Sequence, residues 1–285
     1  MNIRKIKKSL MADKQKLAIA AVIIVVALVL GASTNYDQQT THNNAKITAT
    51  NLNRQLQNTW SKVDTDGITN AQIAVYDKKT SKVYTYTHGS KNSYPTASII
   101  KVFILTYKMS LGELTNDDKD LATQMIEESD NEVTTEMVTS FGGIYQFPKL
   151  FNKLRMTHSN VNQTWGLTQT TATDQLKLLN ELFYNHKILS QSDSNYIANL
   201  MSHVDDNQNW GVSSGVADDT MIQLKNGWLP LDDNYQNAIV NSIGHVQDDN
   251  VDYTIAVLSN GDSTQDDGID YVSALSQATY KALSR

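Results

Sequence analysis

The sequence predicts an α+β fold in which both ends of the chain build one antiparallel sheet, helices flank the sheet, and an all-α subdomain is inserted. Strand-like alternation occurs early, at residues 71–87, and returns late, between residues 221 and 258. Helical patterns fill the chain between these regions, and another helical pattern closes it. A chain of 285 residues is long enough to bury one sizeable core of this kind.

The elements follow in order from local patterns. An amphipathic first helix is expected because Leu52, Leu56 and Trp60 share one helical face. Residues 71–87 are rich in Val, Ile and Tyr and predict a hairpin with its turn at residues 77–80. Further helices are predicted at residues 96–111, 121–141, 146–154 and 173–185. Three later strands are predicted at residues 221–225, 238–243 and 253–258, followed by a closing helix at 269–283.

The N-terminus predicts export. Residues 1–16 hold six of the 24 basic residues, and an apolar stretch follows at residues 17–33, a combination typical of an export signal. As a helix this stretch spans about 24 Å, between a signal-peptide core and the roughly 30 Å of a membrane. A cleaved signal peptide and a membrane anchor both place the body of the protein outside the cytoplasm. Residues 34–50 are expected to form a polar linker and residues 51–285 the folded domain.

Composition excludes several classes of function. The net charge is -6, and an acidic body argues against nucleic-acid binding. The chain contains no cysteine, which rules out disulfides, cysteine-ligated metals, a cysteine nucleophile and a lipidated N-terminal cysteine. The six histidines lack zinc spacing, and the pairs at 248–249 and 266–267 lack the glycine and glutamate of a calcium loop. No metal or cofactor is therefore expected.

Ser98 and Lys101 form the first candidate catalytic pair. Lys101 interrupts an apolar helix, where burial would lower its pKa and convert it from a cation into a general base. Ser98 lies one turn earlier on the same face. With Thr96 as the helix cap, Ser98 would lie in the first turn, where free N–H groups and the helix dipole favour an oxyanion. The alternative is that Lys101 extends to solvent and Ser98 is an ordinary first-turn serine.

A second motif is Ser129-Asp130-Asn131. Its serine hydroxyl could relay a proton to a leaving nitrogen, and the Asn131 amide could hold a substrate carbonyl. Asp130 is expected to order the turn. The alternative is a simple turn or helix cap.

A third motif, Lys225-Asn226-Gly227, ends an alternating apolar strand. Lys225 at that place could bind an anionic substrate carboxylate. Gly227 would permit close approach of the substrate to the backbone.

The three motifs occur in the order S-x-x-K, S-D-N and K-T-G, with Asn226 as the one changed letter. Over residues 51–285 the chain resembles the β-lactamase and D,D-peptidase (penicillin-recognising) superfamily, and within it the class A β-lactamase-like serine hydrolases of bacterial cell surfaces. The resemblance implies that family's β-lactamase/transpeptidase-like architecture. It implies that Ser98 is the acylated nucleophile, Lys101 a base and Ser129 a proton relay.

The resemblance also assigns the substrate contacts. The implied substrate-binding residues are Asn131, Lys225, Asn226 and Gly227. The implied oxyanion hole consists of the backbone N–H groups of Ser98 and Trp228.

Three departures from the family pattern affect this interpretation. Asn226 replaces a hydroxyl residue and alters one contact to the substrate carboxylate. The spacing from Lys101 to Ser129 is short. Class A enzymes use a glutamate after S-D-N to activate the deacylating water, whereas residues 157–173 contain no Asp or Glu. The best ionisable candidate in that stretch is His158.

A competing motif is Gly211-Val212-Ser213-Ser214-Gly215, which fits G-x-S-x-G. An esterase nucleophile elbow needs a strand before this motif and a helix after it. The polar surroundings indicate a loop, so an esterase acting through Ser213 is a minor alternative.

The leading hypothesis is an extracytoplasmic serine acyl hydrolase that acts through Ser98 on D-alanyl cell-wall peptides or on β-lactams, with weak deacylation. The second hypothesis is a low-turnover module of the same fold that binds the wall or senses β-lactams. The expected partners are a cell-wall peptide or a β-lactam, and the membrane if the N-terminal segment is not cleaved.

Overall fold

The computed structural model describes residues 49–230 and 237–284. The predicted basic segment, the apolar stretch and all but the last two residues of the linker lie outside the described residues. Contacts divide the chain into residues 1–51 and residues 52–285, and the fold below is that of the second unit. Within the described ranges, no helix is both long and apolar enough to cross a membrane.

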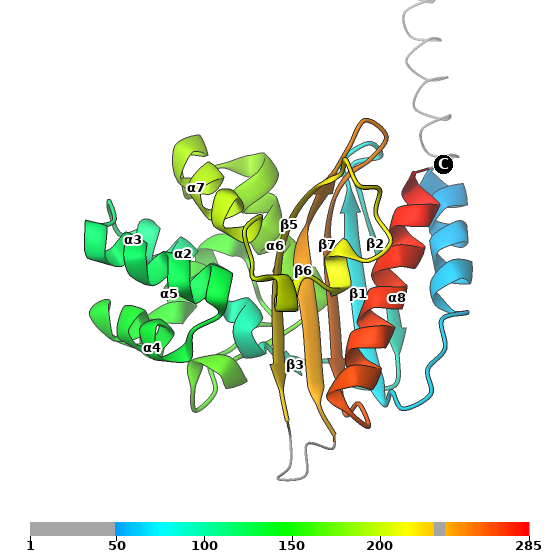
Figure 1. Ribbon diagram of the computed structural model, residues 1–285, viewed down its shortest axis with the longest axis horizontal. Helices are drawn as coiled ribbons and strands as arrows, with labels where there is room; N and C mark the ends of the chain where they lie inside the picture. The colour runs from blue at the N-terminus through cyan, green and yellow to red at the C-terminus, as the bar shows by residue number, and fades with distance from the viewer. Residues whose placement is uncertain (1–48, 231–236, 285) are drawn as a thin grey trace, which may run out of the picture. The chain divides into compact units, whose positions relative to one another are not determined.

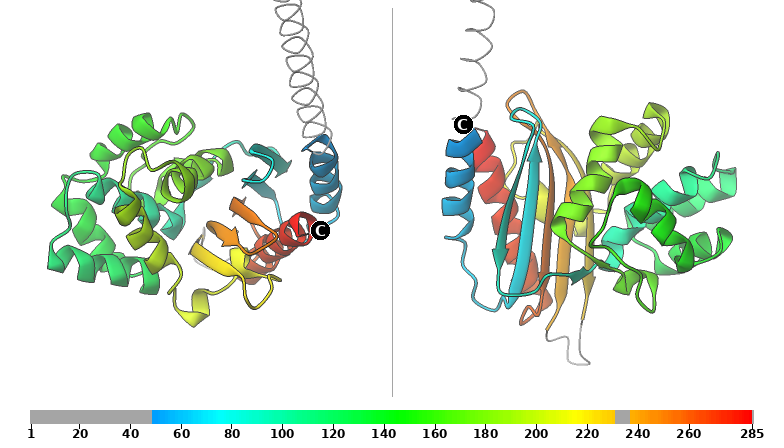
Figure 2. Two further views of the ribbon diagram at one scale, coloured as in Figure 1. Left: turned by 90° about the horizontal axis from the view of Figure 1, so that it is seen from above. Right: turned by 180° about the vertical axis from the view of Figure 1, so that it is seen from behind.

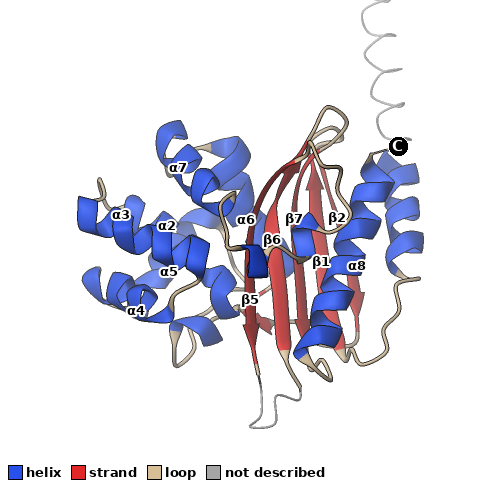
Figure 3. Ribbon diagram, viewed as in Figure 1, coloured by secondary structure: helices blue, strands red, loops and turns tan. Residues whose placement is uncertain are grey.

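A five-stranded antiparallel sheet forms the centre of this unit, with the strand order β2-β1-β7-β6-β5 (Figure 3). Its strands are β1 (Asn70–Asp77), β2 (Lys82–His88), β5 (Met221–Leu229), β6 (Ile239–Gln247) and β7 (Asp252–Asn260). The two ends of the chain meet where β1 pairs with β7, for example Ile73 opposite Val257. The predicted α+β fold is therefore confirmed.

Helices cover both faces of the sheet (Figures 1 and 2). One face is covered by the helical residues 52–60 and by α8 (Gln265–Leu283). The inserted helical region lies on the other side and contains α2 (Ile100–Met109), α3 (Asn116–Thr123), α4 (Asn131–Ser140), α5 (Phe147–Leu154), α6 (Ala172–Asn180) and α7 (Gln191–Met201).

Strand alternation divides the buried apolar residues between two cores. Ile73 and Val75 join the core under α8, whereas Ala74 between them joins the core under the inserted helices. On β7, Val257 and Leu258 divide in the same way. Successive side chains of a strand point to opposite faces, so one sheet supports both layers.

Several boundaries differ from the sequence-based prediction. The predicted helix at 121–141 is broken by a π-helical turn at Gln124–Glu128, followed by a left-handed residue. Helix α7 was not predicted, and β5 runs four residues further than expected. Gly211–Ser213 is a short 3-10 turn that runs into a loop rather than a helix, so the esterase-elbow alternative is wrong.

Candidate active site

Ser98 lies on a strained turn where the chain enters α2. Residues Ala97–Ile99 form a 3-10 turn, and Ala97 adopts a φ of 47°, an uncommon left-handed conformation for a residue with a side chain. The side-chain amide of Asn241 donates to the carbonyls of Pro95 at 2.9 Å and Thr96 at 3.0 Å. Surrounding contacts of this kind allow such a strained turn to persist.

The expectation that Thr96 caps the helix is wrong. Its side chain makes no cap hydrogen bond; the Thr96 hydroxyl instead donates to the Gly166 carbonyl at 3.4 Å. The cause is the intervening 3-10 turn, which delays the start of α2 to Ile100. Ser98 therefore precedes the regular helix rather than lying within its first turn.

Lys101 is completely buried, with 0% of its surface exposed, so the alternative that it extends to solvent is wrong. Its Nζ donates to the Ser129 carbonyl at 2.6 Å, to Asn131 Oδ1 at 2.8 Å and to Ser129 Oγ at 3.1 Å. Desolvation lowers the pKa of Lys101 to about 7, against a smaller opposing effect of Asp130. A lysine with this pKa is partly neutral near pH 7 and is suited to accept a proton.

The second motif forms a sharp turn between a π-helical turn and α4. Ser129 has a φ of 62°, again left-handed. Asp130 caps α4, because its side chain accepts from the backbone N–H of Glu132 at 2.7 Å and of Val133 at 2.9 Å. The expected ordering role of Asp130 is therefore confirmed. Asn131 uses its side-chain oxygen for Lys101, which leaves its NH₂ group as a donor in the cleft.

Lys225 approaches Ser129 from β5. Its Nζ donates to Ser129 Oγ at 3.0 Å, to Gln208 Oε1 at 3.1 Å and to the Asn226 carbonyl at 3.2 Å. Its pKa lies well below the usual value, first because of burial and then because Lys101 is a nearby cation. The structure thus directs the amines of Lys101 and Lys225 at one hydroxyl group.

Asn226 turns away from the position expected for a substrate contact. Its Nδ2 donates to the carbonyls of Gln208 at 2.6 Å and Trp210 at 3.1 Å, and its side chain is fully buried. The longer amide reaches the loop at 205–210, so Asn226 braces this loop and does not line the cleft.

Gly227 allows β5 to approach the Ser98 turn. A Cβ atom at this position would lie 2.6 Å from the backbone nitrogen of Ser98 and 2.7 Å from that of Ile99, which is closer than real contacts of this kind. The glycine is therefore required by packing of β5 against the Ser98 turn.

A cleft of about 490 Å³ opens beside Ser98. It is lined by Ala97, Ser98, Asn131, Thr135, Thr164, Trp165, Gly166, Leu167, Trp228, Leu229 and Pro230. Ser98 and Trp228, the two predicted oxyanion donors, thus border the same space. None of the lining residues has an ionisable acidic or basic side chain.

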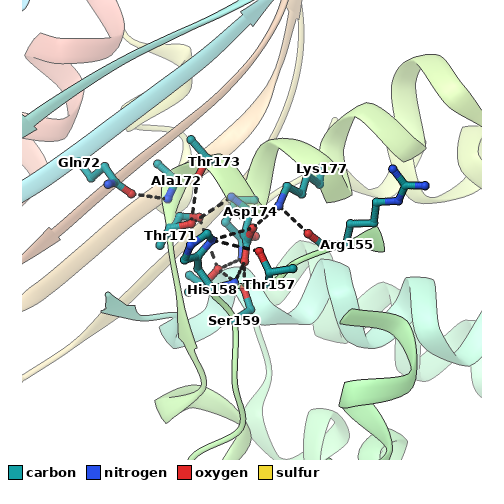
Figure 4. Close-up of polar contacts among 12 residues, drawn as sticks. Gln72, Arg155, Thr157, His158, Ser159, Thr171, Ala172, Thr173, Asp174 and Lys177 are labelled. Atoms are coloured by element: carbon teal, nitrogen blue, oxygen red, sulfur yellow. Dashed lines mark hydrogen bonds and ion pairs between the residues drawn. The ribbon is translucent and has the colours of Figure 1, made fainter. Parts of the chain in front are cut away.

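Residues 164–167 of the loop that follows α5 also line this cleft. Asp174, in α6, anchors the first residues of that loop (Figure 4). The buried carboxylate accepts from the backbone N–H of His158 at 2.8 Å and from Ser159 Oγ at 2.9 Å, and pairs with Lys177 Nζ at 2.7 Å. The His158 side chain is 70% exposed and lies 4.0 Å from Asp174. His158 does not line the cleft, so it does not supply the missing base at Ser98.

The part of this loop nearest the reactive groups is aromatic. The Trp165 ring lies over Lys101, with Nζ 5.3 Å from the ring centroid, and its Nε1 donates to Thr135 Oγ1 at 3.2 Å. An indole is a favourable neighbour for an ammonium group but offers no acceptor to activate water.

Sequence reasoning missed Trp165 and Gln208. Trp165 could have been suspected because it lies within the loop predicted to lack an acid. Gln208 has no such signal, since it lies among polar residues that predict only a loop.

Comparisons with known proteins identify the family and the fold. The model of the beta-lactamase enzyme family matches residues 112–283, and no curated protein matches the chain. The TLA-1 extended-spectrum β-lactamase is 18% identical, with a TM-score of 0.69 over 81% of this chain and 98% of that one. A class A β-lactamase from Bacteroides cellulosilyticus DSM 14838 is 16% identical, with a TM-score of 0.69 over 82% and 98%.

Two structures of PBP-A match as well. PBP-A is 18% identical, with a TM-score of 0.67 over 82% of this chain and 96% of that one. A single-site variant of PBP-A, solved as an acyl-enzyme complex with penicillin G, is 19% identical, with a TM-score of 0.65 over 82% and 96%. At these identities the matches show a common fold.

Proposed function

The chain belongs to the beta-lactamase enzyme family, and from this premise we propose that Ser98 forms an acyl-enzyme with D-alanyl cell-wall peptides or with the β-lactams that resemble them, and releases it slowly. The family match by itself supports a serine hydrolase of the β-lactamase and penicillin-binding type. The single observation that carries the proposal of an acyl-enzyme at Ser98 is the contact set of Lys101, which is buried, has a pKa of about 7 and touches both Ser129 and Asn131.

Acylation follows from this arrangement. The neutral Lys101 amine takes the Ser98 hydroxyl proton while Oγ bonds to the substrate carbonyl carbon. The negative charge that develops on the carbonyl oxygen is stabilised by the backbone N–H groups of Ser98 and Trp228. When the bond from the carbonyl carbon to the leaving nitrogen breaks, Ser129 gives its proton to that nitrogen and regains one from Lys101.

The proposed substrate contacts use the donors around this centre. The free NH₂ group of Asn131 holds a substrate amide carbonyl. Lys225 is the proposed source of positive charge for the substrate carboxylate. Because it has no exposed surface and three protein acceptors, it must exchange one of these acceptors for the carboxylate when the substrate binds. Because the cleft walls next to Ser98 carry no charged side chain, they favour an uncharged acyl group on the substrate.

Slow release follows from the other wall of the cleft. Hydrolysis of the acyl-enzyme needs a base beside a water molecule, and residues 157–173 contain no acid. Trp165 covers Lys101 on that side. This observation also supports the second candidate, a low-turnover module of the same fold that binds the wall or senses β-lactams.

The proposed location is outside the cytoplasm, through a signal peptide or a membrane anchor at residues 17–33. The basic residues 1–16 and the apolar stretch that follows support this proposal.

The test is labelling of the purified protein with a fluorescent penicillin, followed by mass spectrometry to identify the modified residue. We expect the label on Ser98, loss of labelling in Ser98→Ala, and normal labelling in the control Ser213→Ala. Labelling that persists in Ser98→Ala and disappears in Ser213→Ala would overturn the proposal.

A further inference from the structure

Gln208 joins two parts of the candidate site that are far apart in sequence. It ends a 3-10 turn at Asp206–Gln208 and is only 3% exposed. Its Oε1 accepts from Lys225 at 3.1 Å, and its main-chain oxygen accepts from Asn226 Nδ2 at 2.6 Å. Its side-chain amide donates to the Glu127 carbonyl at 3.3 Å, which lies just before the Ser129 turn.

The turn itself is fixed to the same place. The backbone N–H of Asp205 donates to the Glu127 carbonyl at 3.1 Å, and that of Gln208 donates to the Asp205 carbonyl at 2.8 Å. Gln208 is therefore held between the end of the π-helical turn and β5. Every polar group of its side chain has a partner, as expected for a buried polar residue that fixes local geometry.

In its protonated form, Lys225 uses all its hydrogen-bonding capacity in this arrangement. An ammonium group has three N–H donors, and the three acceptors are Ser129 Oγ, Gln208 Oε1 and the Asn226 carbonyl. No carboxylate of the described residues forms an ion pair with Lys225. The titratable groups that act on it are Lys101 and, with opposite sign, Asp205.

We propose that Gln208 is a positioning residue for acylation, which holds Lys225 through its side chain and Asn226 through its backbone so that the Lys225 amine stays directed at Ser129. The inference rests on the proposed acyl-enzyme chemistry at Ser98. It assigns a purpose to Asn226, because its longer amide reaches the Gln208 carbonyl. It also explains the choice of a neutral partner: a glutamine oxygen orients the amine, whereas a carboxylate there would strengthen proton binding.

The test compares two changes at one position by the rate at which a fluorescent penicillin acylates Ser98. Gln208→Leu removes the acceptor and leaves an N–H of a buried amine unpaired, so acylation should slow by about 10- to 100-fold. Gln208→Glu keeps the acceptor and adds a charge, so acylation should stay within a few-fold of wild type at its optimum. The high-pH limit of acylation should move to higher pH, because a carboxylate at position 208 raises the pKa of Lys225, whose protonated amine is directed at Ser129.

Gln223 offers a matched control on β5. It is also a buried glutamine, and its Oε1 accepts from His245 Nδ1 at 2.9 Å. Gln223→Leu should lower stability without moving the pH profile. An unchanged rate in Gln208→Leu, or an unchanged pH profile in Gln208→Glu, overturns the inference.

Failure of the proposed function is separately visible, because wild-type protein would then show no label on Ser98. In that case the contact between Gln208 and Lys225 can still be tested by the ¹⁵Nζ resonance of Lys225 in lysine-labelled protein. The resonance is assigned by its loss in Lys225→Met. The titration of this resonance should move to higher pH in Gln208→Glu and stay in place in Gln223→Leu. A titration that stays in place in Gln208→Glu contradicts the inference.

Discussion

The two sides of the cleft differ in their chemistry. On one side, α2, the Ser129 turn and β5 bring together buried amines, a hydroxyl and an amide within hydrogen-bond distance. On the other side, the loop at 157–173 contributes Thr164, Trp165, Gly166 and Leu167 to the lining and no acid. Because acylation and deacylation are separate steps, this difference is the basis of the proposal that an acyl-enzyme forms at Ser98 and is released slowly.

The largest predicted effect is on the side of the cleft that holds the buried amines. Lys101→Ala removes the proposed base and should slow acylation of Ser98 by about 10²- to 10⁴-fold. In wild-type protein the acylation rate should rise as the pH increases through about 7, because the neutral amine is the active form and the pKa of Lys101 is about 7. Rapid-mixing measurements of penicillin acylation between pH 5 and 9 check both expectations. A rate independent of pH across this range would remove Lys101 from the base role.

A second prediction concerns Lys225 and separates two ways in which it could act. If its charge binds the substrate carboxylate, Lys225→Ala should weaken reaction with carboxylated substrates by about 100-fold and with neutral esters far less. The measurement is kcat/KM for a matched acid and ester pair. Equal losses for both would show that Lys225 acts only through Ser129.

Substitutions that release the loop at 157–173 should lower the stability of the protein rather than its rate of acylation. Asp174→Asn removes the charge that holds His158, Ser159 and Lys177, and should lower the free energy of unfolding by about 1–3 kcal/mol. Denaturant unfolding measures the loss, and limited proteolysis should detect new cleavage within residues 157–173. Asp193→Asn is the control: it changes a half-buried carboxylate in the first turn of α7 and should change stability by less than about 1 kcal/mol. An Asp174→Asn protein of unchanged stability, with no new cleavage in the loop, would show that other contacts hold the start of the loop in place.

A smaller effect is expected from placing an acid where the indole lies. Trp165→Glu should raise the rate of deacylation by about tenfold, because a carboxylate can activate water. It should also slow acylation, since the added anion raises the pKa of Lys101. Trp165→Gln is the uncharged control and should leave deacylation slow. If Trp165→Gln accelerates deacylation equally, access of water rather than a missing base limits the wild-type protein.

The fold and the reactive groups were largely predictable from the sequence, because they depend on local patterns. Alternation predicted β1 and β2 with their turn, and the isolated lysine in the apolar run at 99–105 predicted a buried amine. The left-handed turn at Ser129 was not predictable, because Ser129 has no residue-type signal for a positive φ. The contacts of Asn226 and Gln208 also escaped prediction, since they join positions between 17 and 81 residues apart along the chain through an irregular loop.

Stopped-flow hydrolysis of a chromogenic cephalosporin tests most directly whether acylation of Ser98 is fast and deacylation is slow. The predicted result is a burst near one equivalent of enzyme, followed by slow steady turnover, with the acyl-enzyme on Ser98 visible by mass spectrometry during the slow phase. Rapid steady turnover with no acyl-enzyme accumulating would contradict the account, because it would require a group that activates the deacylating water efficiently despite the loop that Trp165 occupies.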